Sequence, residues 1–454
     1  MKRRNFLNTA ATTAASLAVG RTLRAEDAVR TEPSKKIPMA AGNGILAGKT
    51  LEQLRDEYRY FLYDDYVPFH DRYVVDHQYG GFTLQTGWNG PTISFGKTAR
   101  YTGRGIWTYS FLYNKLDANP RHLEAAAKAV AFIMRHKPTG ENLWPDGYSR
   151  EGKVLAPPST RIYEDLFLAN GFAEYSKIKG NESYWDLAKA ILFKCLKIYD
   201  TPGYHPDAAQ GYLGPEAPLL PGGARVLGHW FMLISLATGM LEGRSDPEIE
   251  AVAARCVEAI TRHHYNPDFD LMNEVICHDF SRPENDLRQL VYTGHALETL
   301  WMVLYEAVRR KDKALFDLIS RHFRRHLEVA WDDVYGGVLR NLRHVEKNIW
   351  DLDKTGWVQM EVLIGLVCII EHTGALWAKE FFSKFYPWVI ANFPLKRYGL
   401  PLWIDGADRR VTFDKGDGTR RAENFHHPRH LMLNLLAIER MIRRGGKVSG
   451  IFPS

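Results

Sequence analysis

The stretch TGWVQMEVLIGLVCII, residues 355–370, is apolar on nearly every side when it is wound as a helix. After a short break comes WAKEFFSKFYPWVIANF, residues 377–393, which keeps its charged residues on one face. A helix that is apolar all round must be buried, and an amphipathic helix must lie outside it. The two stretches therefore predict one inner and one outer helix of a packed pair.

The same alternation of amphipathic and nearly apolar stretches recurs along the chain, six times for each kind. The other apolar stretches are GRGIWTYSFLYNKL (103–116), RIYEDLFLANGFAEYS (161–176), ARVLGHWFMLISLATGM (224–240), GHALETLWMVLYEAV (294–308) and HPRHLMLNLLAIERMI (427–442). Six buried helices ringed by six amphipathic ones predict an all-α fold, the (α/α)6 barrel. An open superhelical stack of helix pairs is the competing architecture. The varied repeat length and the uniformly apolar inner set favour the closed barrel.

Turn-rich segments with short strand-like pieces separate each outer helix from the next inner one. Examples are YGGFTLQTGWNG from Tyr79, YGGVLRNL from Tyr335 and GLPLWIDGADRRV from Gly399. Their Gly-Gly and Asp-Gly steps indicate turns, so we expect short β-hairpins and long loops on one face of the barrel. The N-terminal ends of the inner helices, with free N–H groups and positive dipole ends, meet at that face. We therefore expect a pocket there.

The first residues form a separate segment. Residues 1–25 combine Arg3-Arg4 with a mildly apolar stretch and a small residue near a plausible cleavage point. This pattern predicts a bacterial signal peptide of the twin-arginine type, and hence a periplasmic or otherwise exported protein. We expect a linker over residues 26–45 and the barrel domain over residues 46–446.

Charge and hydropathy argue against two classes of partner. The formal charge is +6, and the signal segment supplies five cations and no acid, which leaves about +1 for the rest of the chain. Nucleic-acid binding would need a basic patch, so we expect none. The longest later apolar run, VLIGLVCII from Val362, is far shorter than the roughly 20 residues of a spanning helix.

The cysteines and histidines do not have the spacing of a metal site. Cys195, Cys256, Cys277 and Cys368 form no CxxC pair, and no HExxH motif is present, so we expect no metal. Buried free thiols are the expected state of these cysteines. Export to an oxidising compartment leaves one disulfide open as an alternative.

Two helix starts carry histidines that would meet only in a closed barrel. His295, Glu298 and Trp301 have i, i+3, i+6 spacing at the start of the fourth inner helix. Such residues share one face, so we expect Glu298 to reach His295 and fix its tautomer. At the start of the sixth inner helix His426 and His427 precede a proline, which favours an extended conformation that aims one side chain over the barrel mouth. An isolated histidine at a helix start is more often a cap or a surface group.

Arg104 is the third candidate site residue. It lies in the first turn of the first inner helix, one turn before Trp107. A cation is unfavourable at that end of a helix dipole. We therefore expect it to face a buried carboxylate or an oxygen-rich ligand.

Taken together, the motifs resemble the superfamily of N-acylglucosamine 2-epimerase, cellobiose 2-epimerase, mannose-type isomerases and sulfoquinovose isomerase. The family patterns GR..W, PGHxxExxW, KxWWxQxE and FHVPR correspond to GRGIW (103–107), TGHALETLW (293–301), KTGWVQME (354–361) and FHHPR (425–429). Thr293 replaces the proline and Gly356 the first tryptophan. The matches keep their order over residues 57–440.

The resemblance implies the roles of several residues. It makes His295 and His426 the two acid/base groups, and places Arg104 and Glu298 against substrate. We expect Trp357 to stack on a sugar ring and Glu361 to be a further substrate-binding carboxylate. Two positions differ from the family: Met232 stands where cellobiose 2-epimerases have another histidine, with His229 one turn away, and Ala422 stands where a lysine is common.

The expected function is that of a sugar 2-epimerase or an aldose–ketose isomerase acting on a reducing sugar. Histidine-mediated proton transfer would pass through an enediolate and needs no cofactor or metal. A glycoside hydrolase or lyase on the same barrel is the alternative, with Glu298, Glu274 and Glu361 as possible mouth carboxylates. A sugar-binding protein without catalysis is a third class. The protein is expected to be a monomer or a homodimer.

Overall fold

The computed structural model describes residues 44–158, 161–206, 212–213, 218–414, 416, 418–419 and 422–452. The predicted signal peptide, residues 1–25, and nearly all of the predicted linker lie outside these residues. The described residues from Gly44 to Phe452 belong to one compact unit. At its C-terminal end Phe452 packs on Phe316, with ring centroids 4.9 Å apart.

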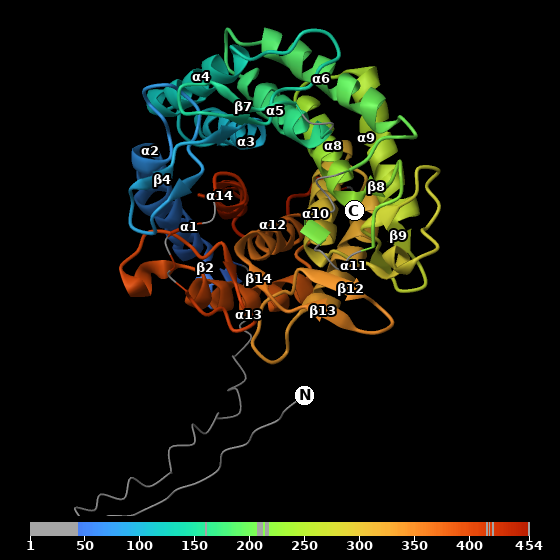
Figure 1. Cartoon of the computed structure of the whole chain (residues 1–454). Coiled ribbons are helices and arrows are strands. Elements are labelled where there is room, and N and C mark those ends of the chain that lie inside the picture. Colours follow the sequence, from blue (N-terminus) through green and yellow to red (C-terminus); the bar gives the residue numbers. More distant parts are fainter. Residues whose placement is uncertain are drawn as a thin grey trace, which may run out of the picture. The chain divides into compact units, whose positions relative to one another are not determined.

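In the described part of the chain six helices form an inner ring (Figure 1). They are α3 (Ala99–Phe111), α5 (Ile162–Tyr175), α8 (Leu227–Met240), α10 (Thr293–Arg310), α12 (Gly356–Thr373) and α14 (His426–Arg443). Each packs against the next. The ring closes where Phe425 contacts Trp107 of α3 at 5.4 Å between centroids and Thr108 donates a hydrogen bond to the carbonyl of Asn424 at 2.8 Å. The predicted closed barrel is confirmed.

Amphipathic helices surround this ring, and each inner helix packs against an outer one. The outer helices are α1 (Leu51–Tyr60), α2 (Val67–Tyr73), α4 (Pro120–Met134), α6 (Ser183–Tyr199), α9 (Pro247–Glu258), α11 (Lys313–Ala330) and α13 (Leu376–Asn392). Short helical turns add η1 (Phe61–Tyr66), η2 (Leu112–Leu116), η3 (Ala259–His264), η4 (Asp286–Gln289) and η5 (Leu395–Tyr398). Asn119, Asp246 and Asp312 cap α4, α9 and α11 by accepting from their first free N–H groups.

The stretch that is apolar on all sides forms α12. Among the described residues it is the one helix with the length and hydropathy to cross a bilayer, and 83% of its apolar stretch is buried inside the barrel. One side of α12 meets α10 and α14 within the ring, and another is covered by α13. Its position between neighbours therefore accounts for its composition.

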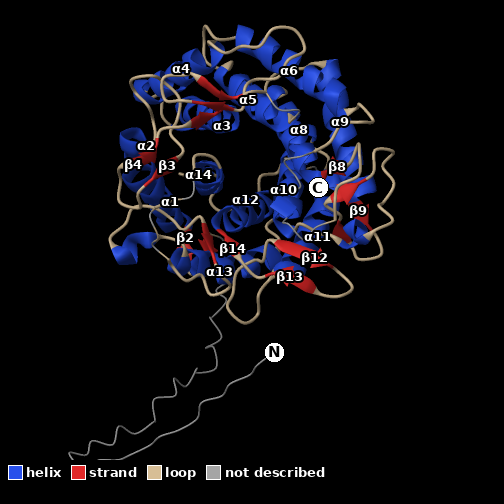
Figure 2. Cartoon of the chain, in the orientation of Figure 1, coloured by secondary structure: helices blue, strands red, loops and turns tan. Residues whose placement is uncertain are grey.

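Short antiparallel strands hold the N-terminal ends of three inner helices (Figure 2). The strands are β1 (Ile45–Leu46), β2 (Lys49–Thr50), β3 (Gln85–Thr86), β4 (Thr92–Ser94), β5 (Lys97–Thr98), β6 (Gly147–Tyr148), β7 (Val154–Ala156), β8 (Arg225–Val226), β9 (Tyr265–Asn266), β10 (Leu271–Met272), β11 (Val275–Ile276), β12 (Asn341–His344), β13 (Ile349–Asp351), β14 (Lys354–Thr355) and β15 (Gly406–Ala407). β5, β8 and β14 run directly into α3, α8 and α12, and pair with β6, β11 and β15. The pairing fixes where each of these helices begins.

The four cysteines are free thiols. Cys195, Cys256 and Cys368 are buried, and Cys277 is partly exposed. Burial raises the pKa of the Cys256 and Cys368 thiols, which keeps them protonated and unreactive. The expectation of free thiols is confirmed.

A buried lysine–aspartate pair flanks each of two YGG turns, with the aspartate before the turn and the lysine after it. Lys354, at the start of β14, places its Nζ 2.8 Å from Asp332 Oδ2, and neither side chain is exposed. The guanidinium of Arg409 binds the other oxygen of Asp332 at 2.8 Å. Lys97 and Asp76 repeat this arrangement before α3, at 3.0 Å. The pairs join the loop after an outer helix to the strand that leads into the next inner helix.

Replacing Lys354 with methionine would leave Asp332 buried with one cation fewer. We expect the free energy of unfolding to fall by about 3 kcal/mol, since removing one partner of a buried pair leaves a charge that water cannot reach. Urea denaturation would measure the change. Lys313→Met, at an exposed pair with Asp317 on α11, is the matched control and should cost about 1 kcal/mol or less. Equal losses in the two variants would show that the buried pair does not hold the loop.

Candidate functional site

The N-terminal ends of the inner helices enclose a cavity of about 170 Å³, here called the upper cavity. Its wall consists of Arg100, Arg104, Tyr163, Tyr212, Val226, Gly228, His229, Phe231, Tyr292, His295, Glu298, Trp357 and His426. His295 and His426, from α10 and α14, both lie against Trp357, with ring centroids 5.8 and 5.4 Å from it. The structure thus brings the two predicted histidines to one site, together with Arg104, Glu298 and Trp357.

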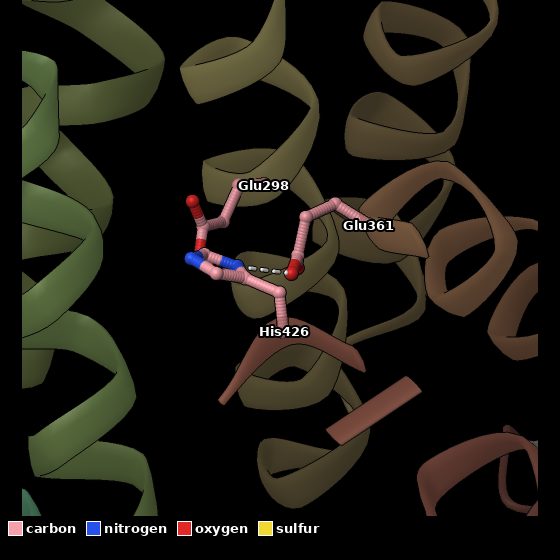
Figure 3. Close-up of side chains that lie close together, drawn as sticks. All are labelled: Glu298, Glu361 and His426. Atoms are coloured by element: carbon pink, nitrogen blue, oxygen red, sulfur yellow. Dashed lines mark hydrogen bonds and ion pairs between the residues drawn. The ribbon is translucent and has the colours of Figure 1, made fainter. Parts of the chain in front are cut away.

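His426 is held by a carboxylate behind it (Figure 3). Its Nδ1 lies 2.7 Å from Oε1 of Glu361, so Nδ1–H donates and Nε2 is left as the proton-accepting atom. Burial lowers the pKa of His426 to about 3, with Glu423 and Glu298 opposing the shift. The imidazole is therefore neutral at neutral pH.

A guanidinium lies behind His426 as well. Nη2 of Arg429, on the next turn of α14, binds Oε1 of Glu298 at 2.5 Å and Oε1 of Glu361 at 2.7 Å. Trp301 Nε1 donates to the other Glu361 oxygen at 2.6 Å. Protein groups therefore engage both oxygens of Glu361, which is fully buried and lies outside the wall of the upper cavity. Glu361 was predicted to bind substrate, whereas the structure places it where it orients His426.

His295 has a different partner from the one its spacing suggested. Its Nδ1 lies 3.0 Å from Oε1 of Glu274, in the loop before β11, and Tyr212 donates to the same oxygen at 2.6 Å. The prediction that Glu298 fixes His295 is wrong, because the buried charge of Arg429 draws Glu298 toward α14. Glu274 was noted in the sequence only as a possible mouth carboxylate.

The helix α14 begins earlier than the proline suggested. It starts at His426, two residues before Pro428, so the expected extended conformation of the two histidines is wrong. Pro428 falls in the first turn, where a helix needs no N–H from it. His427 packs on Trp403, with ring centroids 4.5 Å apart, and lines a separate cavity of about 280 Å³. His426 alone of the two lines the upper cavity.

Arg104 is buried in the wall of the upper cavity. Its guanidinium lies over the ring of Phe167 at 4.3 Å and over that of Phe425 at 5.1 Å. The two aromatic faces attract the cation and offset part of the unfavourable dipole. Its charge is thus held beside the histidines.

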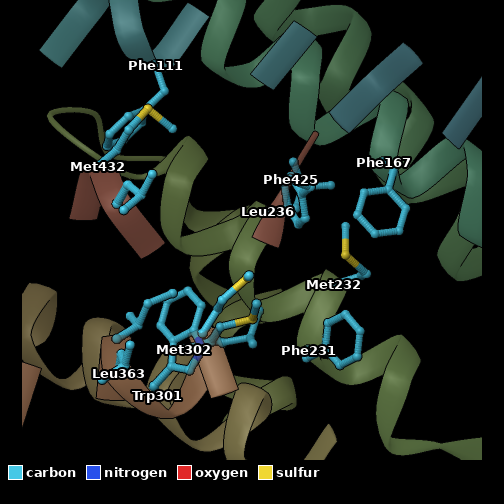
Figure 4. Close-up of a cluster of buried hydrophobic side chains, with 14 of the residues drawn as sticks. Phe111, Phe167, Phe231, Met232, Leu236, Trp301, Met302, Leu363, Phe425 and Met432 are labelled. Atoms are coloured by element: carbon cyan, nitrogen blue, oxygen red, sulfur yellow. The ribbon is translucent and has the colours of Figure 1, made fainter. Parts of the chain in front are cut away.

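His229 is a third histidine in the wall of the upper cavity. It lies one helical turn from Met232, as predicted from the sequence. Its Nε2 lies 3.3 Å from the hydroxyl of Tyr204. Burial lowers the pKa of His229 to about 3, with the neighbouring His295 adding to the shift. Met232 is buried and belongs to the cluster of buried hydrophobic side chains in Figure 4.

Glu298, Glu361 and His426 bring three possible metal-ligating atoms within 4.8 Å of one another. Arg429 already donates to both carboxylates at hydrogen-bonding distance. The guanidinium therefore supplies the positive charge that such a cluster requires. No role was predicted for Arg429 from the sequence, although it is the last residue of the motif FHHPR.

Comparisons with known proteins identify the family of this chain. The sequence model of the N-acylglucosamine 2-epimerase (GlcNAc 2-epimerase) family matches residues 80–428. The mouse (Mus musculus) N-acylglucosamine 2-epimerase is 24% identical over 61% of this chain, which spans 65% of that enzyme's length. The bovine (Bos taurus) enzyme is 23% identical over 82% of this chain and 88% of its own.

Among solved structures, cellobiose 2-epimerase from Spirochaeta thermophila DSM 6192 has a TM-score of 0.70 at 18% identity. The superposition covers 86% of this chain and 98% of that one, and shows that the two share a fold. The family match covers most of the barrel and includes the motifs at the helix ends, apart from Arg429, the last residue of FHHPR. The chain therefore belongs to the N-acylglucosamine 2-epimerase family.

Proposed function

We propose that this protein is a sugar 2-epimerase or an aldose–ketose isomerase that acts on a reducing sugar. One observation carries the proposal: two histidines share the wall of one cavity, and each has its Nδ1 on a buried carboxylate. This arrangement leaves both Nε2 atoms for proton transfer. Family membership supports the same chemistry.

The reaction follows from the positions of these groups. One histidine removes the proton from carbon 2 of the open-chain aldehyde, and the electron pair passes to the carbonyl to form an enediolate. Return of a proton to the other face of carbon 2 gives the epimer, and return to carbon 1 gives the ketose. Arg104 offers positive charge to the enediolate oxygens. When His426 takes the proton, Glu361 at 2.7 Å stabilises the imidazolium.

The geometry does not favour hydrolysis. A glycosidase needs two opposed carboxyl groups with the scissile bond between them. Within the described part of the chain the wall of the upper cavity includes one carboxylate, Glu298, and it is ion-paired with Arg429. Simple sugar binding would not require a buried carboxylate behind each of two histidines.

Substitution of either histidine tests the proposal. His295→Asn and His426→Asn should each lower turnover by about 10²–10⁴-fold, since each removes a positioned proton-transfer group. The assay is a screen of reducing sugars in deuterated water, with label followed at carbons 1 and 2. His427→Asn, on the same turn but outside the upper cavity, is the control and should keep most of the activity. Undiminished exchange in either active-site variant would refute the mechanism.

The carboxylate behind His426 should affect turnover more than substrate binding. Glu361→Gln is expected to lower kcat by about 10²-fold or more with little change in KM, because the imidazolium loses its counter-charge. The control is Glu371→Gln, which removes another buried, arginine-paired carboxylate of α12 at the far end of the helix. Steady-state kinetics would separate the two variants. A parallel loss of kcat in both would indicate general destabilisation.

We further propose that the protein is exported in a folded state by the twin-arginine route. Arg3-Arg4 and the weakly apolar stretch behind it support this proposal. Fractionation of bacteria that express the full chain should recover it outside the cytoplasm. The variant with Arg3→Lys and Arg4→Lys should stay in the cytoplasm, while Arg21→Lys, beyond the pair, should still be exported. Retention of the unaltered protein would exclude this route.

A further inference from the structure

A second cavity, here called the lower cavity, lies further along the inner helices and measures about 470 Å³. On α3 the upper cavity meets Arg104 and the lower one Phe111, and on α10 the upper meets His295 and the lower Tyr305. The lower cavity therefore lies among the C-terminal halves of these helices. None of the described residues lines both cavities.

Five of the six inner helices, α3, α5, α8, α10 and α14, each turn one face toward the lower cavity. On α5, for example, the wall residues have i, i+3, i+4, i+7 spacing, which keeps them on one face of the helix. They are Asn170, Ala173, Glu174 and Lys177. The cavity opens to solvent near the ion pair of Lys115 and Glu242, whose side chains are 32% and 51% exposed.

The charges of this wall are neutralised within the protein. Each basic residue of the wall has its nearest carboxylate oxygen at 2.5 to 2.7 Å, and these residues are Lys115, Lys177, Arg309, Arg429 and Arg440. A charged ligand would lose its hydration on entering without meeting a free counter-charge. The wall therefore favours an uncharged ligand.

Aromatic rings form much of the interior. Trp107 and Phe111 stack with centroids 4.8 Å apart, and Phe425 meets Trp107 edge-on at 5.4 Å. Trp301 and Tyr305 form a second edge-on pair at 5.3 Å. Figure 4 shows Phe111, Trp301 and Phe425 among the buried side chains of the barrel. Such rings pack well against the C–H groups of a ring-shaped ligand, and the cavity lies in the size range of small-molecule sites, about 300–1,000 Å³.

Neutral polar groups without a protein partner lie among these rings. Asn170 is 4% exposed, and its side-chain amide keeps accessible surface but makes no hydrogen bond to a described residue. The hydroxyls of Ser235 and Tyr305 and the indole N–H of Trp107 are likewise without a hydrogen-bond partner in the described part of the chain. These four residues belong to α5, α8, α10 and α3, so hydrogen-bonding groups face the cavity from four helices.

We propose that the lower cavity binds a neutral sugar in its ring form, at a site separate from the upper cavity. The hydroxyls around a pyranose ring point outward, toward Asn170, Ser235 and Tyr305, while its C–H groups pack on the aromatic rings. An amide suits this role because it donates to one hydroxyl and accepts from the next. A purely apolar ligand would bury Asn170 without a partner, which is costly. The binding does not depend on the proposed function, since it uses no group of the proposed proton transfer.

Titration calorimetry with methyl α-D-glucopyranoside tests the class of ligand, because the ring of this glycoside cannot open and so is not turned over. We expect a Kd of about 1–10 mM, which is ordinary for a small polar ligand. Cyclohexylmethanol lacks the ring hydroxyls, and methyl α-D-glucopyranosiduronate adds a carboxylate. Each should bind about tenfold more weakly or not at all. Equal or tighter binding of either compound would overturn the assignment to a neutral sugar, and no binding of the glucoside at ten times the expected Kd would overturn the site.

Variants of the wall test where the glucoside binds. Ser235→Phe adds a ring from α8 and should abolish binding, whereas Ser320→Phe, on the outer helix α11, should not. Asn170→Leu should weaken binding by about tenfold, the loss expected for hydrogen bonds to one amide. His295→Asn, in the upper cavity, should leave the Kd unchanged. Loss of binding in His295→Asn, or unchanged binding in Ser235→Phe, would refute the proposal. Circular dichroism would check the fold of each variant, and if Asn170→Leu does not fold, Ser235→Phe decides the outcome.

Discussion

One guanidinium holds the centre of the barrel together. Nη2 of Arg429 binds Glu298 of α10 and Glu361 of α12, so a single cation joins three consecutive inner helices on the axis. None of these charges is accessible to water, and loss of one member would leave the others unpaired at a cost of about 3–5 kcal/mol. The same bonds determine which way Glu361 points, and Glu361 in turn orients His426. The arrangement of the proposed catalytic centre therefore depends on an ion cluster beneath it.

The two histidines reach the same state by different means. His426 takes its carboxylate from a neighbouring inner helix, whereas His295 takes Glu274 from a loop of the hairpin face. In both cases Nδ1 is occupied and Nε2 is available, as the proposed proton transfer by two acid/base groups would require. A barrel supports this arrangement because its helix ends converge while its loops supply side chains from the rim.

The fold could be predicted from the sequence because the buried faces of helices appear in it as periodic patterns of apolar residues. Helices apolar on all sides, such as residues 356–373, alternate with amphipathic ones, and concentric rings satisfy both patterns. The convergence of His295 and His426 then followed from closure. The partners of these histidines could not be predicted, because the spacing of residues on one helix does not show which charged side chains a neighbouring helix places beside them. Glu298 is correctly spaced to reach His295, yet a buried arginine 131 positions away draws it elsewhere.

The packing around Arg429 explains why two of its donors have no partner among the described residues. A ring of six helices leaves its axis to side chains, and here Trp301 and Phe425 lie against the guanidinium of Arg429. The aromatic rings of Trp301 and Phe425 pack on the guanidinium, and they do not accept hydrogen bonds from its edge. Rotation of Arg429 toward other acceptors would break its bonds to Glu298 and Glu361. The unpaired donors are thus a consequence of the ion cluster that orients His426.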